Sequence, residues 1–335
     1  MSPSHRFAVL VRCVLIVATS GCASAGSSVD APPPSAIPRN PAGVFAVTST
    51  LDIRLPAATK AVVDSLTVAT TGPDEPTRYL LDHMLAQLPD GTIKTIALDA
   101  APIVAAYLDG EVASIAPRFQ SGITAIAQGL TTIATRFGTV ETLRVDDTGA
   151  AIRTVTAARF QVSATPTVVA FGDFGLADLV VSTHVGLDGA GRVTIPSHAI
   201  AFPYGALLRL GLDHAVIPSV DSTATNLTAV LTGLVDCEML GQLVSDRLGV
   251  GSDGLYTAAC VAGMNAIATD IYARLAAIDA GGPAQLALAG AAEGIDLDGD
   301  GLMDQVRAGV WTGALVTAGS TDAINDGTFT GSKGP

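Results

Sequence analysis

The sequence predicts an α+β protein. In it, an antiparallel β-sheet, sandwich- or barrel-like, packs against a long bent helix and a disulfide-stapled helical hairpin. Three observations carry this prediction. Residues 138–198 alternate apolar and polar side chains, residues 102–137 repeat apolar side chains at intervals of three and four, and the two late cysteines lie in neighbouring helical segments. Separate runs of strands and of helices are typical of the α+β class.

The first elements are predicted from periodicity and from residues that end helices. Residues 43–56 alternate apolar and polar side chains, which indicates a strand. Residues 74–91 have a proline near each end of a helical pattern, which is typical of helix boundaries. The apolar pattern of residues 102–137 then predicts one long helix, with a bend near Pro117 because proline breaks the helical hydrogen-bond ladder.

The rest of the body is predicted as strands, then helices, then strands. Residues 138–198 form an antiparallel meander with turns at "DDTG", "FGDFG" and "DGAG". A helical subregion covers about 203–279, with Pro218 expected after the end of its first helix. Three strands close the chain, and the final ones are expected to pair with the first. We predict a single α+β domain over residues 43–335, with two subdomains as the alternative.

The N-terminus predicts export and a lipid anchor. Residues 1–21 have a short basic start and an apolar run too short to cross a membrane, as in a lipoprotein signal peptide. The letters "TSGC" resemble a bacterial lipobox, in which the cysteine, here Cys22, becomes lipidated. The alternative is an ordinary cleaved signal with an incidental cysteine. Neither Ala23 nor Ser24 is Asp, which favours the outer membrane, with the protein facing the periplasm or the surface.

Residues 22–42 are predicted to join the lipid to the body. After Cys22 they are small, polar and rich in proline and serine, so they cannot form a core and suit a tether. The membrane partner of this protein would therefore be reached through the N-terminal lipid.

Two of the four cysteines remain for a disulfide in the body. Cys13 leaves with the signal peptide and Cys22 carries lipid, so Cys237 and Cys260 form an even pair in an exported chain. In the chain-entropy account, a loop of this length stabilises by about 3 kcal/mol. Two buried free thiols are the alternative.

The stretch "DLDGDGLMD" predicts a calcium-binding loop. Calcium takes six to eight oxygen ligands, and alternating aspartates on a tight turn can direct carboxylates to one point. The loop resembles the first nine residues of a dockerin or EF-hand calcium loop. The predicted ligands are the side chains of Asp296, Asp298, Asp300 and Asp304, with the backbone carbonyl of Leu302.

The calcium-type loop, residues 296–307, departs from the EF-hand pattern at its end. Arg307 stands where a bidentate glutamate is usual, so a further ligand has to come from Glu293, Asp322, Asp326 or water. Without that glutamate we expect weak binding, with a dissociation constant of about 10⁻⁴–10⁻³ M. The predicted Ca²⁺ is structural and braces a loop between strands. A turn without metal is the alternative.

No catalytic motif is present. The sequence has no G-x-S-x-G, no H-E-x-x-H and no phosphate-binding loop. His83, His184, His198 and His214 are scattered among apolar neighbours, and adjacent Asp213 and His214 on a helix point apart. We therefore predict no catalytic residues, no organic cofactor and no enzyme activity. A His198 or His214 within hydrogen-bond reach of a Ser or Asp in a cleft would reopen that question.

The charge excludes one class of partner. The net charge is −13, and no cluster of Lys and Arg follows the first dozen residues. Binding of nucleic acid depends on such a basic surface, so a nucleic-acid role is excluded.

Several stretches together resemble a group of known proteins. The letters "PDEPTRYLLDHMLAQLPDG", "AFPYGALLRLGLDHAVIP", "LVDCEML", "AAC" and "DLDGDGLMD…GVWTG" are similar to uncharacterised secreted lipoproteins of myxobacterial type. The resemblance implies the lipoprotein location and brings no known activity.

The predicted function is binding rather than catalysis. We expect a non-catalytic outer-membrane lipoprotein with a structural calcium loop that binds an apolar or lipid-like ligand, or an envelope partner. The ligand prediction rests on hydrophobicity alone. The alternatives are a structural envelope protein without a small-molecule ligand, and a hydrolase whose site is not recognisable in the sequence.

Overall fold

The computed structural model describes residues 36–68, 75–111 and 116–334. The predicted signal peptide, residues 1–21, and the lipidation site Cys22 lie outside the described residues. The strands are β1 Gly43–Ile53, β2 Arg136–Val145, β3 Ala150–Phe160, β4 Thr167–Ala170, β5 Leu179–His184, β6 Gly186–Leu187, β7 Arg192–Phe202, β8 Ala284–Ile295, β9 Gln305–Val316 and β10 Thr321–Lys333. The helices are α1 Ala57–Val68, α2 Glu75–Ala86, α3 Thr92–Leu108, α5 Phe119–Thr135, α6 Tyr204–Gly211, α7 Ile217–Val220, α8 Leu227–Leu234, α9 Cys237–Leu248 and α10 Asp253–Ile278.

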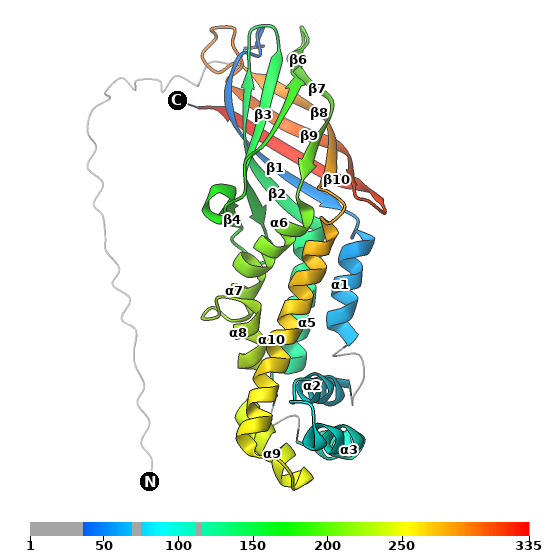
Figure 1. Cartoon of the computed structure of the whole chain (residues 1–335). Coiled ribbons are helices and arrows are strands. Elements are labelled where there is room, and N and C mark those ends of the chain that lie inside the picture. Colours follow the sequence, from blue (N-terminus) through cyan, green and yellow to red (C-terminus); the bar gives the residue numbers. More distant parts are fainter. Residues whose placement is uncertain (1–35, 69–74, 112–115, 335) are drawn as a thin grey trace, which may run out of the picture. The chain divides into compact units, whose positions relative to one another are not determined.

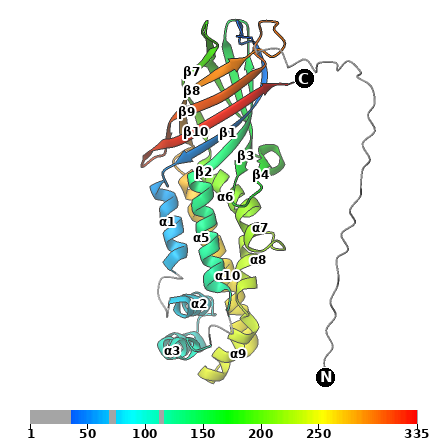
Figure 2. The same cartoon turned by 180° about the vertical axis from the view of Figure 1, so that it is seen from behind.

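The described strands form one antiparallel sheet of ten strands. The hydrogen-bonded order is β4-β3-β2-β1-β10-β9-β8-β7-β6, and β5 pairs with β3 beside that path. The final strands were predicted to pair with the first. This is confirmed for β10, which lies antiparallel to β1, whereas β9 pairs with β10 and β8. Figure 2 shows β2, β1, β10 and β9 following one another across the sheet. The α+β class is therefore confirmed.

The sheet is curved, so that strands near the two ends of its hydrogen-bonded order come together. β5 lies against β7, although the hydrogen-bonded ladders of the described strands include no pair between these two. The predicted meander is therefore interrupted after β5, and β7 pairs with β8 from the end of the chain. One face of the sheet is the inner face: in β1 the alternate residues Phe45, Val47 and Leu51 are buried there.

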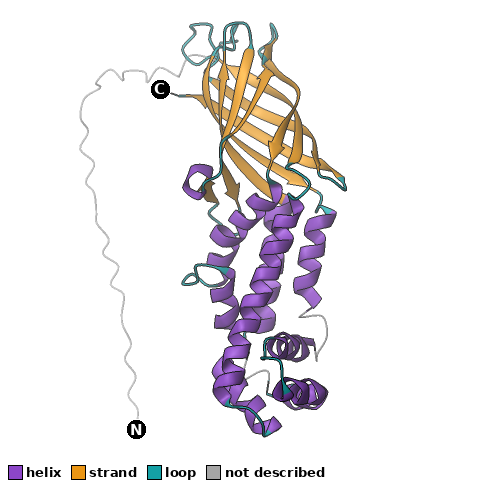
Figure 3. Ribbon diagram, in the orientation of Figure 1, coloured by secondary structure: helices purple, strands orange, loops and turns teal. Residues whose placement is uncertain are grey.

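The helices gather at one end of the sheet (Figures 1 and 3). α5 contacts β1 and β2, and its apolar stripe includes Ile126, Leu130 and Ile133, all buried. A small residue makes one contact of α5 possible. A Cβ atom on Gly129 would lie 2.5 Å from Cγ1 of Val216, so only glycine fits there without a shift.

The predicted single bent helix over 102–137 is wrong, because the described part of this range contains the end of α3 and the whole of α5. α3 begins at Thr92 and ends at Leu108, and α5 begins only at Phe119. Pro117 lies just before the N-cap residue of α5, Arg118, so it precedes a helix instead of bending one, and its missing N–H removes no bond inside α5. Pro102, in contrast, lies inside α3. The apolar periodicity of the sequence runs through both helices, because each of them buries part of its surface.

Two further helix boundaries differ from the prediction. A π-helical turn, Leu212–Val216, joins α6 to α7, and Pro218 lies in the first turn of α7 rather than after a helix end. The helical turns are continuous across this point, since the backbone N–H of Ile217 donates to the carbonyl of Leu212 in the π-helical turn. The predicted helix over about 225–248 divides into α8 and α9, and the side chain of Asp236 caps α9.

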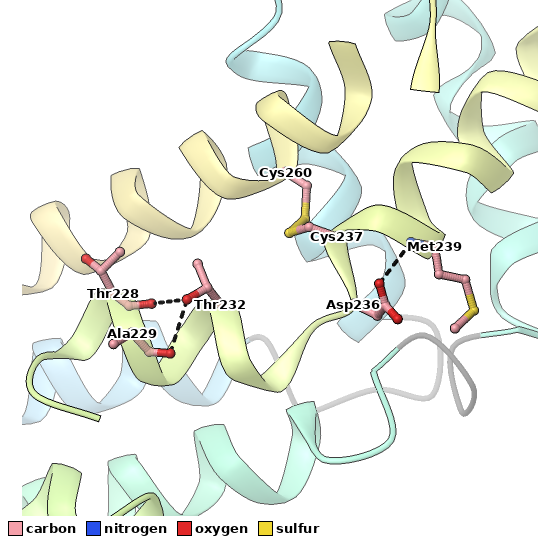
Figure 4. The surroundings of a disulfide bond; sticks show 7 residues. All are labelled: Thr228, Ala229, Thr232, Asp236, Cys237, Met239 and Cys260. Carbon is pink, nitrogen blue, oxygen red and sulfur yellow. Dashed lines mark hydrogen bonds between the residues drawn. A yellow bond between two sulfur atoms is a disulfide. The ribbon is translucent and has the colours of Figure 1, made fainter. Parts of the chain in front are cut away.

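The predicted disulfide is confirmed. Cys237 begins α9, Cys260 lies in α10, and their Cα atoms are 5.6 Å apart (Figure 4). Asp236 accepts a hydrogen bond of 2.9 Å from the backbone N–H of Met239, which fixes the first turn of α9 beside the disulfide. The bond therefore joins two packed helices at a capped helix end.

Of the helices in the described ranges, none alone has the length and hydropathy needed to cross a bilayer; α8 and α9, bent by 53°, pass this test of length and composition as a pair.

Candidate functional site

The structure brings three predicted calcium ligands together. Oxygen atoms of Asp296, Asp298 and Asp304 all lie within 4.8 Å of one another, in an arrangement that could hold a metal ion. Asp300 is not part of this cluster, and its carboxylate accepts a hydrogen bond of 2.7 Å from the backbone N–H of Leu302. Glu293, Asp322 and Asp326, the further carboxylates considered from the sequence, do not join the cluster either.

The loop geometry explains how the carboxylates converge. Asp296 is 1 % exposed, and its two oxygens accept the backbone N–H groups of Gly299 (2.7 Å) and Gly301 (2.9 Å). Both glycines have a positive φ, which closes the turn around this carboxylate. Asp304 accepts the N–H of Leu297 at 2.9 Å. Each carboxylate oxygen can accept more than one bond, so capacity for a cation remains.

The donor set fits a hard cation better than a soft one. The cluster consists of carboxylate oxygens, the ligand type that Ca²⁺ prefers, and contains no sulfur or imidazole. Three carboxylates this close repel one another when all are ionised. The charge of Lys333 offsets part of that repulsion, since its Nζ lies 3.7 Å from Asp304. A bound divalent cation would offset the remainder.

The same loop holds the segment that leads into β1. Ala36 exchanges backbone hydrogen bonds with Asp296, and the N–H groups of Arg39 and Asn40 both donate to the carbonyl of Gly301. Residues 36–42, the last part of the predicted tether, thus lie along the loop rather than apart from the body. These backbone hydrogen bonds link the loop to the residues just before β1.

A groove lies between α2 and α3, with apolar and charged residues in its walls. Its volume is about 560 Å³, within the usual range for small-molecule sites. Its lining residues are Arg78, Leu81, Asp82, Leu98, Ala101, Pro102, Ala105, Ala106 and Asp109. Much of the apolar surface of α3 is open, and Ile103 is 65 % exposed. Exposed apolar surface of this kind often marks a binding site.

The interior where the sheet meets the helices is closely packed. A hollow there, lined by residues such as Phe137, Phe160 and Tyr204, has a volume of only about 10 Å³. That is room for about one water molecule. The groove on α3, and not this interior, therefore offers space for a ligand.

A buried polar cluster inside the sheet was not predicted from the sequence. Glu141 on β2 and Arg153 on β3 form an ion pair with both side chains 1 % exposed, and Arg153 Nη2 donates to Glu141 at 2.7 Å. Hydroxyl groups of Ser49 and Thr139 also donate to Glu141. The guanidinium of Arg153 stacks over the ring of Trp311, 4.6 Å from its centroid.

The electrostatics of this cluster keep Glu141 ionised. Burial alone would raise its pKa, but the charge of Arg153 and the hydrogen bonds from Arg153, Thr139 and Ser49 hold the pKa below the ordinary value. A signal was present in the sequence: Glu141 and Arg153 each occupy an inward-facing position in an alternating strand. A charge at such a position in two adjacent strands indicates a buried pair.

The histidines noted in the sequence do not meet Ser or Asp in the hydrogen bonds of the described residues. The ring of His198 bonds to Arg153 and to the carbonyl of Pro196. The ring of His214 lies against Phe174, with the centroids 4.3 Å apart.

The carboxylate of Asp213 forms its hydrogen bond with a tyrosine and not with a histidine. It accepts the hydroxyl of Tyr272, which also accepts the backbone N–H of Leu227. Burial and this bond raise the pKa of Tyr272 to about 12. The contact fixes the π-helical turn to α10, and so explains Asp213 as a packing residue.

These features define an α+β protein with a curved antiparallel sheet, a disulfide-linked helical layer, an acidic loop and a groove on α3. No protein-family model, curated protein or solved structure matches the chain.

Proposed function

We propose that this protein is a non-catalytic lipoprotein of the bacterial outer membrane that binds an apolar or lipid-like ligand between α2 and α3. The groove of about 560 Å³ is the observation that carries the proposal. The membrane location rests on the N-terminal sequence, "TSGC" and the tether after it.

The groove suits a ligand with an apolar body and a polar end. Leu81, Leu98 and Pro102 give it apolar walls, while Arg78 and Asp109 provide charge. One carboxylate oxygen of Asp109, Oδ1, is buried and has no hydrogen-bond partner among the described residues. A buried acceptor without a partner is costly, so a donor on the ligand would be favoured there.

Native mass spectrometry of a Cys22→Ser form, exported and gently purified, tests ligand binding. We expect a co-purified lipid-like mass. Ala106→Trp should weaken binding by tenfold or more and so lower the occupied fraction, since an indole fills part of the groove and about 1.4 kcal/mol already corresponds to tenfold in the dissociation constant.

The matched control is Ala258→Trp, the same substitution at an exposed position on α10, away from the groove. It should leave occupancy unchanged. A clean protein mass from the unmodified chain would contradict ligand binding and favour the structural envelope role.

We further propose that the loop around Asp296 binds Ca²⁺ and braces the junction of tether and sheet. At 1 mM Ca²⁺ and a dissociation constant of about 10⁻⁴ M, binding should stabilise the fold by about 1.4 kcal/mol. A chelator should remove that gain, as measured by thermal unfolding. Asp298→Asn should abolish it, since Asp298 belongs to the cluster and is exposed.

Asp300→Asn is the matched control, because Asp300 lies in the same loop but outside the cluster. It should keep most of the calcium response. Unfolding that is indifferent to both Ca²⁺ and chelator would contradict the calcium proposal and leave the groove proposal standing.

A further inference from the structure

A side-chain hydrogen bond joins two strands that lie near opposite ends of the hydrogen-bonded order of the sheet. β3 and β7 are each second from an end of the hydrogen-bonded order, yet Nη1 of Arg153 on β3 lies 3.0 Å from Nε2 of His198 on β7. Beside them β5 lies against β7 without a ladder between the two. The Arg153–His198 bond thus spans a seam that backbone hydrogen bonds do not close.

The geometry fixes the protonation state of His198. Arginine can only donate, so Nε2 of His198 must be the acceptor and carries no proton. Nδ1 lies 3.0 Å from the carbonyl of Pro196, which can only accept, so Nδ1 carries the proton. His198 is therefore a neutral imidazole with both ring nitrogens in use. A second proton would have to enter at Nε2, facing the guanidinium of Arg153.

The surroundings of His198 do not compensate for that extra charge. The charged groups that act on it are Arg153 from β3 and Glu141 from β2. Glu141 already accepts hydrogen bonds from Arg153, Ser49 and Thr139. The other strands place uncharged groups here: Leu288 of β8 is opposite in the register, and the Trp311 ring of β9 meets the imidazole edge-on.

The remaining charged residues of β5, β7 and β8 lie away from this point. The titratable residue of β5, His184, has its ring beside Gly149 at a turn. Arg192 and Glu293 are register partners near one end of β7 and β8.

We propose that the His198–Arg153 bond is a pH-sensitive latch, which holds the seam of the sheet closed while His198 is neutral and releases it on acidification. When Nε2 takes up a proton, the acceptor for Arg153 is lost and two cations face each other at about hydrogen-bond distance. Separation of β7 from β3 and β5 relieves that repulsion and hydrates both groups. This inference is independent of the groove and of calcium.

The direction of the pKa supports the latch. Burial lowers the pKa of His198 below its ordinary value of 6.5, and the charge of Arg153 acts the same way, against the bond to Pro196 and the charge of Glu141. The unfolded chain therefore binds this proton at a higher pH than the folded chain. The free energy of unfolding falls as the pH drops through about 6.5, and stops falling below the folded-state pKa.

Trp311, the sole tryptophan, reports on the latch directly. Its indole N–H donates to Ser49 at 3.1 Å, and its ring contacts both Arg153 and His198. In the Cys22→Ser protein between pH 8 and pH 5, we expect a fluorescence transition with a midpoint below 6.5. Amide hydrogen exchange in β5 and β7 should rise with it, by about tenfold for each pKa unit of linkage.

His198→Gln should abolish the transition, because a glutamine carbonyl can still accept from Arg153 and does not titrate. His184→Gln is the matched control on β5 and should leave the transition unchanged. The latch is overturned if the unmodified protein shows no transition, or if His198→Gln retains it.

A measurement on the unmodified protein guards against a variant that fails to fold. Nitrogen chemical shifts of the imidazole should report the Nδ1–H tautomer at pH 8 and a pKa below 6.5. An Nε2–H tautomer, or a pKa above 6.5, would overturn the latch.

Discussion

Replacing Arg153 with Met is expected to lower the free energy of unfolding by about 3–5 kcal/mol. The substitution keeps an unbranched side chain but leaves the buried Glu141 carboxylate without its counter-ion. It also removes the donor to His198 and the stack on Trp311. Denaturant unfolding followed by circular dichroism measures the loss. The fluorescence of Trp311 should change with it.

Two comparisons make this prediction specific. The double variant Glu141→Leu, Arg153→Met should recover at least half of the loss, because an uncompensated buried charge costs more than the pair contributes. Asp64→Asn, which breaks the exposed pair with Lys60 on α1, should cost less than about 1 kcal/mol. If Arg153→Met also costs less than that, Glu141 is not held by Arg153 in the way described.

Removing the disulfide is expected to cost about 3 kcal/mol. Cys237 and Cys260 are 23 residues apart. In the chain-entropy account, a disulfide that closes a loop of this size lowers the entropy of the unfolded chain and so stabilises the fold by that amount. The test is the Cys237→Ala, Cys260→Ala double variant in the Cys22→Ser background, unfolded in denaturant. α9 should be affected first, since it begins at the disulfide and packs on α10.

Reduction gives an internal control for that prediction. Dithiothreitol should destabilise the Cys22→Ser protein by a similar amount and leave the double alanine variant unchanged. A loss below about 1 kcal/mol in the double variant would mean that the helices hold each other in the same arrangement without the covalent link.

The acidic loop illustrates how far a local pattern can predict a site. The spacing of Asp296, Asp298 and Asp304 was sufficient to bring their oxygens together, since a tight turn with two glycines needs no distant partner. Asp300 fits the same pattern, but its carboxylate turns to the N–H of Leu302. The docking of residues 36–42 on this loop depends on a segment more than 250 residues away in sequence, and no local pattern encodes it.

The sequence by itself determined the α+β class, the pairing of Cys237 with Cys260, and the positions of most strands and helices. These follow from periodicity, end residues and composition, which act over a few residues. Only the tertiary structure decided three further features: the pairing of β7 with β8, the groove between α2 and α3, and the Arg153–His198 bond across the seam. Arg153 and His198 are 45 residues apart. Their contact depends on how far the whole sheet curves, and the twist between neighbouring strands accumulates over the ten-stranded sheet.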